Sequence, residues 1–481
     1  MKVLYAASEA VPLAKTGGLA DVAGALPRAV AELGVKPALI MPAYAEVGKD
    51  ILACFRTIAE FPVQLGWRNQ TCRLLSAEIA GIACYLIDND YYYKRGSLYG
   101  YDDEAERFVF FCFAVMEAVP HLAELPDIIH CHDWQTGMIP FLLRNRYGDR
   151  PPYRRIRTVF TVHNLQYQGV FSTEVLMDLL SAGPEWFTPE TLEFYGGASC
   201  MKAGLLYADK LTTVSETYAR EILTEAYGER LEGVLRMRRR DLVGIVNGID
   251  TASFDPMRDP ALAVPFGDSL ADKRRNKPPL QRELGLELSE QRPLIGMVSR
   301  LADQKGFDLL ERALEPLIAE GVQLAVLGSG DYRFEKLLRQ AASAHPRRIA
   351  VRFGFDDALA RRIYAGSDLY LMPSRFEPCG LSQLIALRYM SVPVVRETGG
   401  LADTVQPFDE YTGEGTGFRF RAYTPAALLD AVRRALSVYR QPALWAQAAR
   451  NGAGQDFGWS RSARAYLDVY SKIATSGKES V

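Results

Sequence analysis

The chain has 481 residues, of which 48% are hydrophobic and 24% are charged, and its formal net charge is -2. This composition is typical of a globular protein with two or three domains. A chain so close to neutrality has no general attraction for nucleic acid or anionic lipid. It contains no run of 18 uncharged apolar residues, so no membrane span is predicted.

The cysteines indicate a reducing compartment. Seven are scattered along the chain, an odd number, and no two form a C-x-x-C pair. Most lie among apolar residues, as buried free thiols do. The apolar run after Lys2 is too short for the core of a secretion signal and predicts a first buried strand instead. We therefore expect a cytoplasmic protein without disulfides.

Short apolar runs alternate with helical stretches along the whole chain. Such runs are typical of strands buried on both faces of a parallel sheet, so the sequence predicts an α/β fold. Twelve runs are too many for one Rossmann-like unit but suit two units of about six strands each. The predicted strands are 2–7, 37–41, 83–87, 127–131, 157–162, 210–214, 243–246, 293–298, 322–327, 348–353, 368–372 and 392–396.

The predicted domains are residues 1–242, residues 243–458, and a C-terminal helix in 459–481 that packs back on the first domain. The boundary follows the basic run 237–240. The stretch 268–292 is charged and poor in apolar residues, which predicts a surface excursion of the second domain. The tail 475–481 is expected to be frayed.

One six-residue sequence occurs twice. The sequence TGGLAD stands at 16–21 and again at 398–403, each time after a predicted strand and at the start of a predicted helix. A glycine pair there lets backbone N–H groups approach an anion at the positive end of the helix. Packing alone would explain one copy, whereas one copy in each half favours a pair of anion-binding turns.

Polar residues follow the predicted strands, where α/β proteins bind their ligands. Arg300 and Lys305 follow strand 293–298 and suit the phosphates of a diphosphate; the alternative is a solvated basic loop. Glu377 follows strand 368–372. It suits a sugar hydroxyl or positive charge developing at an anomeric carbon, although a carboxylate stabilised by a helix dipole is equally plausible. His163 ends strand 157–162 and suits either a site or a structural role.

Other patterns argue against metals and several enzyme classes. The Asp88-Asn89-Asp90 sequence resembles a metal-binding D-x-D, but it leads into three tyrosines and favours an aromatic loop. His130 and His132 lack a third ligand at zinc spacing. There is no P-loop, no G-x-G-x-x-G after the first strand and no G-x-S-x-G. These are the best-known signatures of NTPases, dehydrogenases and α/β-hydrolases, so their absence argues against those enzyme classes.

The ordered set of motifs resembles the bacterial glycogen synthases and plant starch synthases over essentially the whole chain. This resemblance implies the GT-B fold, with two doubly wound Rossmann-like domains facing each other across a deep cleft. It also implies transfer of glucose from ADP-glucose to the non-reducing 4-OH of an α-1,4-glucan, with retention of configuration. The motifs are KTGGLADV (15–22), HDWQTG (132–137), TVHNLQYQG (161–169), GIVNGID (244–250), SRLADQKG (299–306) and PSRFEPCGL (373–381).

The resemblance also assigns residues to roles. It makes His163, Arg300, Lys305 and Glu377 the catalytic set, with the two cations on the diphosphate. Phe355 stands where several relatives have tyrosine, beside the expected adenine pocket, which weakens the adenine assignment. The other donor-side residues are Lys15, Gly17, Gly18, Gly328, Cys379, Gly380, Leu381, Thr398, Gly399 and Gly400; the acceptor-side residues are Tyr93, Asp133, Asn164 and Asn247.

Several alternatives stay open at this stage. A related enzyme using UDP-glucose or a small acceptor fits the same motifs, and a catalytically inactive glucan-binding protein is a further candidate. A phosphorylase is disfavoured because no pyridoxal-lysine signature is recognised. The resemblance implies no metal and no pyridoxal phosphate. It does not decide between front-face attack and a covalent intermediate, and the sequence does not give the oligomeric state.

Overall fold

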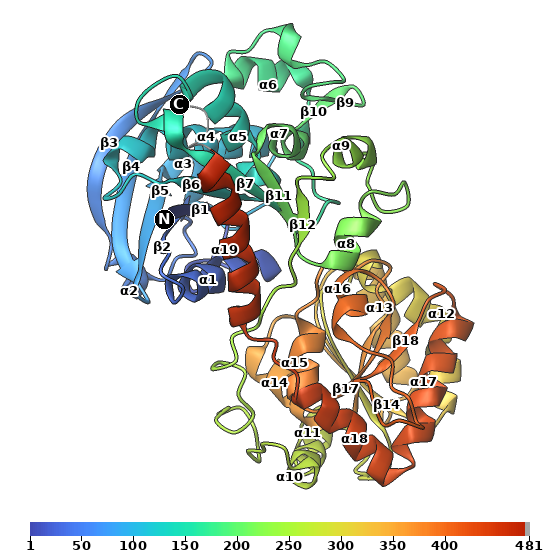
Figure 1. The fold of residues 1–481 in the computed structure, drawn as a ribbon. Coiled ribbons are helices and arrows are strands. Elements are labelled where there is room, and N and C mark those ends of the chain that lie inside the picture. The colour runs from blue at the N-terminus through green and yellow to red at the C-terminus, as the bar shows by residue number, and fades with distance from the viewer. Residues whose placement is uncertain (477–481) are drawn as a thin grey trace. The chain divides into compact units, whose positions relative to one another are not determined.

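The computed structural model describes residues 1–476, which form two compact units (Figure 1). One unit comprises Met1–Gly248 and the helix that starts at Trp459, and the other comprises Ile249–Gly458. The predicted boundary at residue 242 is wrong, because β12 (Leu242–Gly244) pairs in parallel with β11 (Lys210–Thr213) in the first sheet. The run after residue 242 thus completes the first sheet instead of opening the second. The tail beyond residue 476 lies outside the described residues.

The first unit is built on a nine-stranded sheet within the described residues. Its order is β12-β11-β7-β6-β1-β2-β5-β4-β3, parallel except where β4 pairs with its two neighbours. The chain runs outward from β1 in both directions, so the order reverses between β1 and β6. A small antiparallel sheet has the order β8-β10-β9. The remaining strands are β1 (Lys2–Ala6), β2 (Lys36–Pro42), β3 (Arg56–Leu65), β4 (Arg68–Ile79), β5 (Ile82–Asp88), β6 (Ile128–His132), β7 (Arg157–Val162), β8 (Val170–Phe171), β9 (Glu193–Phe194) and β10 (Gly197–Ser199).

Some helices of the first unit, starting with the one at Gly18–Ala31, bury one apolar side. In the first of them, Leu19, Val22, Ala23, Leu26 and Val30 are buried, which is the spacing of one helical face. The helices are α1 (Gly18–Ala31), α2 (Lys49–Leu52), α3 (Asp90–Tyr93), α4 (Glu104–Ala118), α5 (Met138–Leu142), α6 (Thr173–Leu180), α7 (Cys200–Tyr207), α8 (Glu216–Glu221), α9 (Glu232–Met237) and α19 (Trp459–Ser476).

The C-terminal helix α19 packs within the first unit, where it contacts α1 and β7 (Figure 1). The hydroxyl of Tyr470 on α19 lies 2.9 Å from the Tyr5 hydroxyl and 2.8 Å from Nδ1 of His130. All three side chains are fully buried. These hydrogen bonds satisfy polar groups that would otherwise be costly inside the core.

The second unit contains a six-stranded parallel sheet within the described residues. Its order, β15-β14-β13-β16-β17-β18, is that of a Rossmann-like sheet, with a topological switch point between β13 and β16. Ligands of such sheets bind beyond the carboxyl ends of the strands at that point. The strands are β13 (Leu294–Val298), β14 (Gln323–Leu327), β15 (Ile349–Arg352), β16 (Leu369–Met372), β17 (Val392–Arg396) and β18 (Phe418–Phe420).

The stretch 268–292, predicted as a surface excursion, folds into two short helices that are held to the unit by buried polar residues. Lys273, Lys277 and Gln281 are almost fully buried. The helices of this unit are α10 (Leu270–Arg274), α11 (Lys277–Leu284), α12 (Phe307–Ala319), α13 (Tyr332–Ala344), α14 (Asp357–Gly366), α15 (Ser382–Arg388), α16 (Gly399–Thr404), α17 (Pro425–Tyr439) and α18 (Pro442–Ala453).

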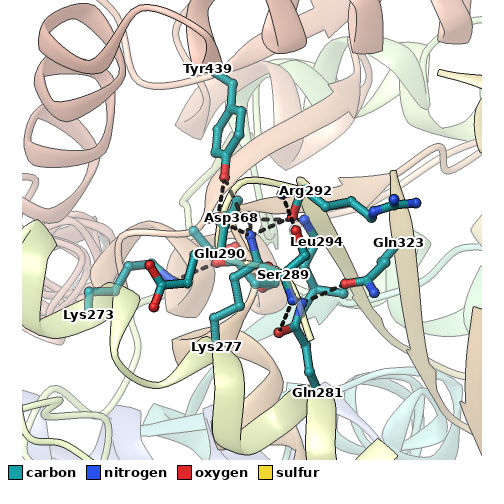
Figure 2. A network of polar contacts seen from close by, with 12 residues as sticks. Lys273, Lys277, Gln281, Ser289, Glu290, Arg292, Leu294, Gln323, Asp368 and Tyr439 are labelled. Carbon is teal, nitrogen blue, oxygen red and sulfur yellow. Dashed lines mark hydrogen bonds and ion pairs between the residues drawn. The ribbon is translucent and has the colours of Figure 1, made fainter. Parts of the chain in front are cut away.

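Figure 2 shows the polar network around these lysines, at the amino ends of β13 and β16. Nζ of Lys277 lies 2.6 Å from Oδ2 of Asp368, which also accepts a hydrogen bond from the backbone N–H of Leu294. Lys273 donates to the carbonyl oxygens of Ala365 and Ser367, and its burial lowers its pKa to about 7. The network joins the starts of the two central strands and leaves their carboxyl ends for the site.

All twelve predicted strands are present, and the α/β prediction is confirmed. The sequence did not predict the hairpin of β3 and β4, the small sheet, or β18. Among the described residues, no helix is both long and apolar enough to cross a membrane.

Candidate active site

The centre of the site in the second unit is an ion pair at the switch point. Lys305, after β13, places Nζ 2.9 and 2.7 Å from the two carboxylate oxygens of Glu377, after β16. Ser374 Oγ donates to the same carboxylate over 3.0 Å. The Glu377 side chain is only 6% exposed and that of Lys305 18%. The structure thus brings together two of the predicted catalytic residues, which lie far apart in the sequence.

Glycines allow the loops around this ion pair to pack closely. Gly306 has φ +79° and Gly399 has φ +45°, a region that favours glycine. A Cβ on Gly306 would overlap the carbonyl oxygen of Pro373, and one on Gly399 would overlap that of Glu377. The loops after β13, β16 and β17 are therefore held against one another by backbone contacts, which fixes the position of Glu377.

The second TGGLAD turn does not present all its amides to a ligand as predicted. The N–H of Thr398 donates to the Arg396 carbonyl oxygen, and that of Gly400 donates to the Glu377 carbonyl oxygen, both over 3.0 Å. The expectation that Thr398 and Gly400 offer backbone donors to a phosphate is wrong for this conformation. The turn instead positions the Glu377 backbone.

The other predicted donor residues lie on the loops at the same carboxyl edge. Arg300 is exposed after β13, and Gly328 after β14 packs against the Ser299 carbonyl oxygen. Phe355 follows the edge strand β15 and is 84% exposed, so its role beside an adenine stays a prediction. The motif residues Cys379, Gly380 and Leu381 precede α15; Cys379 is buried, and Gln383 donates to the Cys379 and Gly380 carbonyls.

In the first unit, the first TGGLAD turn binds an anion that belongs to the protein. The Glu9 carboxylate accepts from the backbone N–H groups of Thr16 and Gly17 and from the Thr16 hydroxyl. Burial raises the pKa of Glu9, and these hydrogen bonds oppose that rise. Lys15 is exposed and pairs with Asp21 over 2.7 Å. Glu9 occupies the turn in this structure, and the predicted donor-side roles of Lys15, Gly17 and Gly18 stay predictions.

Three residues at the carboxyl ends of β6 and β7 form a second cluster in the first unit. Nδ1 of His132 lies 2.9 Å from Nε2 of His163, and the Asp133 carboxylate accepts from the backbone N–H of His163 over 2.7 Å. Burial lowers the pKa of His163 to about 3, so its imidazole is neutral at physiological pH. His163 therefore suits hydrogen bonding to a neutral ligand and does not suit charge pairing with a phosphate.

Asp133 should give the protein a distinctive pH dependence. Burial raises its pKa to about 7, against the backbone N–H groups of His163 and Asn164, which lower it. The folded protein then binds a proton more tightly than the unfolded chain between about pH 4 and 7, so this group's contribution to stability falls as pH rises. Compared with Asp133→Asn, the wild-type protein should gain about 2 kcal/mol of unfolding free energy between pH 8 and pH 5 in urea titrations. Parallel pH profiles of the two proteins would show that Asp133 titrates normally.

A recess of about 730 Å³ in the first unit has Trp134, the residue after Asp133, in its wall. Tyr101, Trp134, Tyr167 and Phe171 contribute aromatic rings to its wall, and Gln168 contributes an amide. Among the described residues, the buried Gln168 Oε1 has no hydrogen-bond partner. Aromatic rings beside a few polar groups are typical of a small-molecule site.

The predicted acceptor residues differ in their surroundings. Asn164 is half-buried beside His163, and Asn247 is buried with an Oδ1 that has no partner among the described residues. Tyr93 is fully buried, and its hydroxyl donates to the Arg107 carbonyl oxygen. Its predicted role on the acceptor surface is wrong in this structure, because the tyrosine run folds into helix α3 and turns this ring into the core.

Within residues 1–476, no three His, Cys, Asp or Glu side chains are grouped so as to hold a metal ion. His130, considered as a zinc ligand, instead hydrogen-bonds to Tyr470 and to Thr161.

Sequence reasoning assigned no role to Glu9 or to Ser374, although Ser374 lies in the motif 373–381, and did not predict the link between His132 and His163. Glu9 stands shortly after the first strand and Ser374 shortly after β16, so their positions at strand ends were the available signal. Which polar atoms each of them meets depends on contacts between distant segments.

Two family models match the chain. The model described as starch synthase catalytic domain matches residues 2–237, and the one described as glycosyl transferases group 1 matches residues 285–452. Among curated proteins, a glycogen synthase of Desulforamulus reducens is 50% identical over 99% of this chain and 100% of its own length. A glycogen synthase of Geobacillus thermodenitrificans is 49% identical over 98% of both chains.

Solved structures agree with these matches. The catalytic domain of starch synthase IV from Arabidopsis thaliana, bound to ADP and acarbose, has a TM-score of 0.92 at 31% identity and covers 98% of this chain, which covers 99% of that one. A sucrose-phosphate synthase from Thermosynechococcus elongatus, at 17% identity and TM-score 0.63, shares the fold. The predicted GT-B fold and glycosyltransferase activity are confirmed. The chain belongs to the family of bacterial glycogen synthases and starch synthases.

Proposed function

We propose that this protein extends glycogen by transferring glucose, with retention of configuration, from ADP-glucose to the non-reducing 4-OH of an α-1,4-glucan, releasing ADP. The observation that carries this proposal is the Lys305–Glu377 pair at the switch point of the second sheet. A cation there stabilises the diphosphate as it leaves, and a carboxylate beside it stabilises positive charge at the anomeric carbon. Arg300, on the same loop as Lys305, supplies a second cation for the diphosphate.

Because these two cations neutralise the leaving group, the proposal needs no metal. It includes no pyridoxal phosphate, since no pyridoxal-lysine signature is recognised in the sequence. The choice between front-face attack and a covalent intermediate stays open. A cytoplasmic location also stays a prediction, based on the cysteine pattern.

The recess of the first unit suits the glucan acceptor. Aromatic faces pack against sugar rings, and Tyr101, Tyr167 and Phe171 line this recess. Tyr167 is 48% exposed, so its truncation should cost little stability. Tyr167→Ala should raise KM for glycogen about three- to tenfold, with an unchanged KM for the nucleotide sugar. Tyr411→Ala, at a 99% exposed tyrosine of the second unit, is the control. Equal KM values for glycogen in both variants would remove Tyr167 from the acceptor site.

The decisive experiment follows labelled glucose into glycogen and measures the released nucleoside diphosphate, with ADP-glucose and UDP-glucose in parallel and with EDTA in a third arm. Incorporation from ADP-glucose that survives EDTA is the expected result. Incorporation mainly from UDP-glucose would overturn the adenine assignment but keep the chemistry. Glycogen binding without transfer from either donor would favour a catalytically inactive glucan-binding protein.

A further inference from the structure

His132 is a fully buried histidine whose two ring nitrogens have very different surroundings. Its Nδ1 lies 2.9 Å from Nε2 of His163, the predicted catalytic histidine. Its Nε2 is buried and has no hydrogen-bond partner among residues 1–476. No role in the proposed reaction has so far been given to this side chain.

Two buried rings lie near the ring of His132. The His130 ring lies 4.2 Å away between centroids, and the Tyr5 ring stacks at 6.1 Å with an interplanar angle of 21°. His130 is itself fixed, because its Nδ1 bonds to the Tyr470 hydroxyl and its Nε2 bonds to the Thr161 hydroxyl. The hydrogen bond between His132 and His163 therefore involves a His132 ring that lies beside a fixed neighbour.

Both members of the pair are neutral. Burial lowers the pKa of His132 well below its usual range and lowers that of His163 to about 3. Each neutral imidazole has one N–H and one bare nitrogen, so the bond between the rings has one donor and one acceptor. Only two arrangements of the protons are possible.

The surroundings of His132 distinguish the two arrangements. If His163 donated, the N–H of His132 would lie on Nε2 and would be buried without a partner, and orphaned buried N–H groups are rare. If His132 donates from Nδ1, only a bare lone pair is left unsatisfied on Nε2. The proton of His163 then lies on its Nδ1, and His163 is the half-buried member of the pair.

We infer that His132 is a positioning residue: it donates its Nδ1–H to Nε2 of His163 and so keeps the His163 proton on Nδ1, as a donor to an oxygen atom of the bound sugar. The part of this inference that concerns the sugar rests on the proposed function. The tautomer does not, since it follows from the protein alone. His163 then acts as a fixed hydrogen-bond donor and not as the base that removes the acceptor proton.

Two-bond ¹⁵N–¹H spectra of the full chain labelled with [¹⁵N]histidine test the tautomer directly, with His163→Gln to assign the signal. The expected spectrum shows His163 protonated on Nδ1. A His163 protonated on Nε2 in the wild-type protein would overturn the inference. The spectrum identifies the His163 tautomer even if the protein transfers no glucose. Failure of the tautomer inference and failure of the proposed function can therefore be told apart.

Variants of His132 test the consequence for turnover. The side-chain amide of His132→Asn can still donate from near the Nδ1 position, whereas His132→Leu cannot donate. We expect the asparagine variant to keep kcat within about threefold and the leucine variant to lose about tenfold. The His163 spectrum should change only in the leucine variant. Equal losses of kcat in both folded variants would indicate a merely structural role. His121→Asn, at an exposed histidine of the same unit outside this cluster, is the control and should leave the His163 tautomer unchanged.

Discussion

Replacing Lys305 with alanine is expected to lower kcat about 100- to 1,000-fold, by analogy with removal of one preorganised group that stabilises a transition state. Lys305 is the cation closest to the Glu377 carboxylate, with Nζ 2.7 Å from Oε2. In the proposed reaction its charge stabilises the diphosphate as negative charge develops there. The loss should therefore fall on kcat, measured as ADP release at saturating ADP-glucose. Lys336→Ala, at an exposed lysine of the same unit, is the matched control.

Stability has to be separated from catalysis in this variant. Removing Lys305 leaves the nearly buried Glu377 carboxylate without its countercharge. Breaking a fully buried ion pair in this way lowers the free energy of unfolding by about 3–5 kcal/mol, and the loss should be smaller here because Lys305 is partly exposed. The double variant Lys305→Ala/Glu377→Gln removes both charges and should recover part of that stability without recovering turnover. A folded Lys305→Ala protein with near-normal kcat would remove Lys305 from the catalytic set.

Gly399→Ala is expected to lower kcat about 100-fold, because it moves the backbone that holds Glu377. A Cβ at this position would overlap the Glu377 carbonyl oxygen, and the φ of +45° is unfavourable for alanine. Gly321 provides a matched control, since its φ is +87° and a Cβ there would meet no atom within 4 Å. Gly321→Ala should lose about 1 kcal/mol of unfolding free energy through backbone strain alone, with kcat unchanged. Equal kcat in both variants would mean that the loop adapts and that the position of Glu377 does not depend on Gly399.

The sequence predicted those parts of the fold that leave a local signal. Strands such as β14 are buried along their whole length, so each one is a continuous apolar run. The strand β3 was missed because it is partly exposed and contains Glu60, Pro62 and Gln64 among its apolar residues. The strand β18 is short and has Arg419 between its two phenylalanines, so it does not form an apolar run. The domain boundary was wrong because an apolar strand does not reveal which of two sheets it joins.

The predictions for the site divide in the same way, into features that have a local sequence signal and features that do not. Residue type and position after a strand made Lys305, Glu377 and His163 candidates, and the resemblance to glycogen and starch synthases gave them their predicted roles. Their partners depend on the order of strands in the sheets. Lys305 and Glu377 meet because β13 and β16 are neighbours in the second sheet. The burial of Tyr93 and the occupation of the first glycine turn by Glu9 depend on side-chain packing, which no local pattern shows.

The position of α19 has a consequence for synthesis on the ribosome. Residues 1–248 emerge first, but the helix that completes their core follows only after the whole of residues 249–458. Until then Tyr5 and His130 lack the hydroxyl of Tyr470. Domains generally fold as units during translation, and here only the second unit is continuous in the chain. The histidine cluster of the first unit is therefore completed only after residues 249–458 have been synthesised.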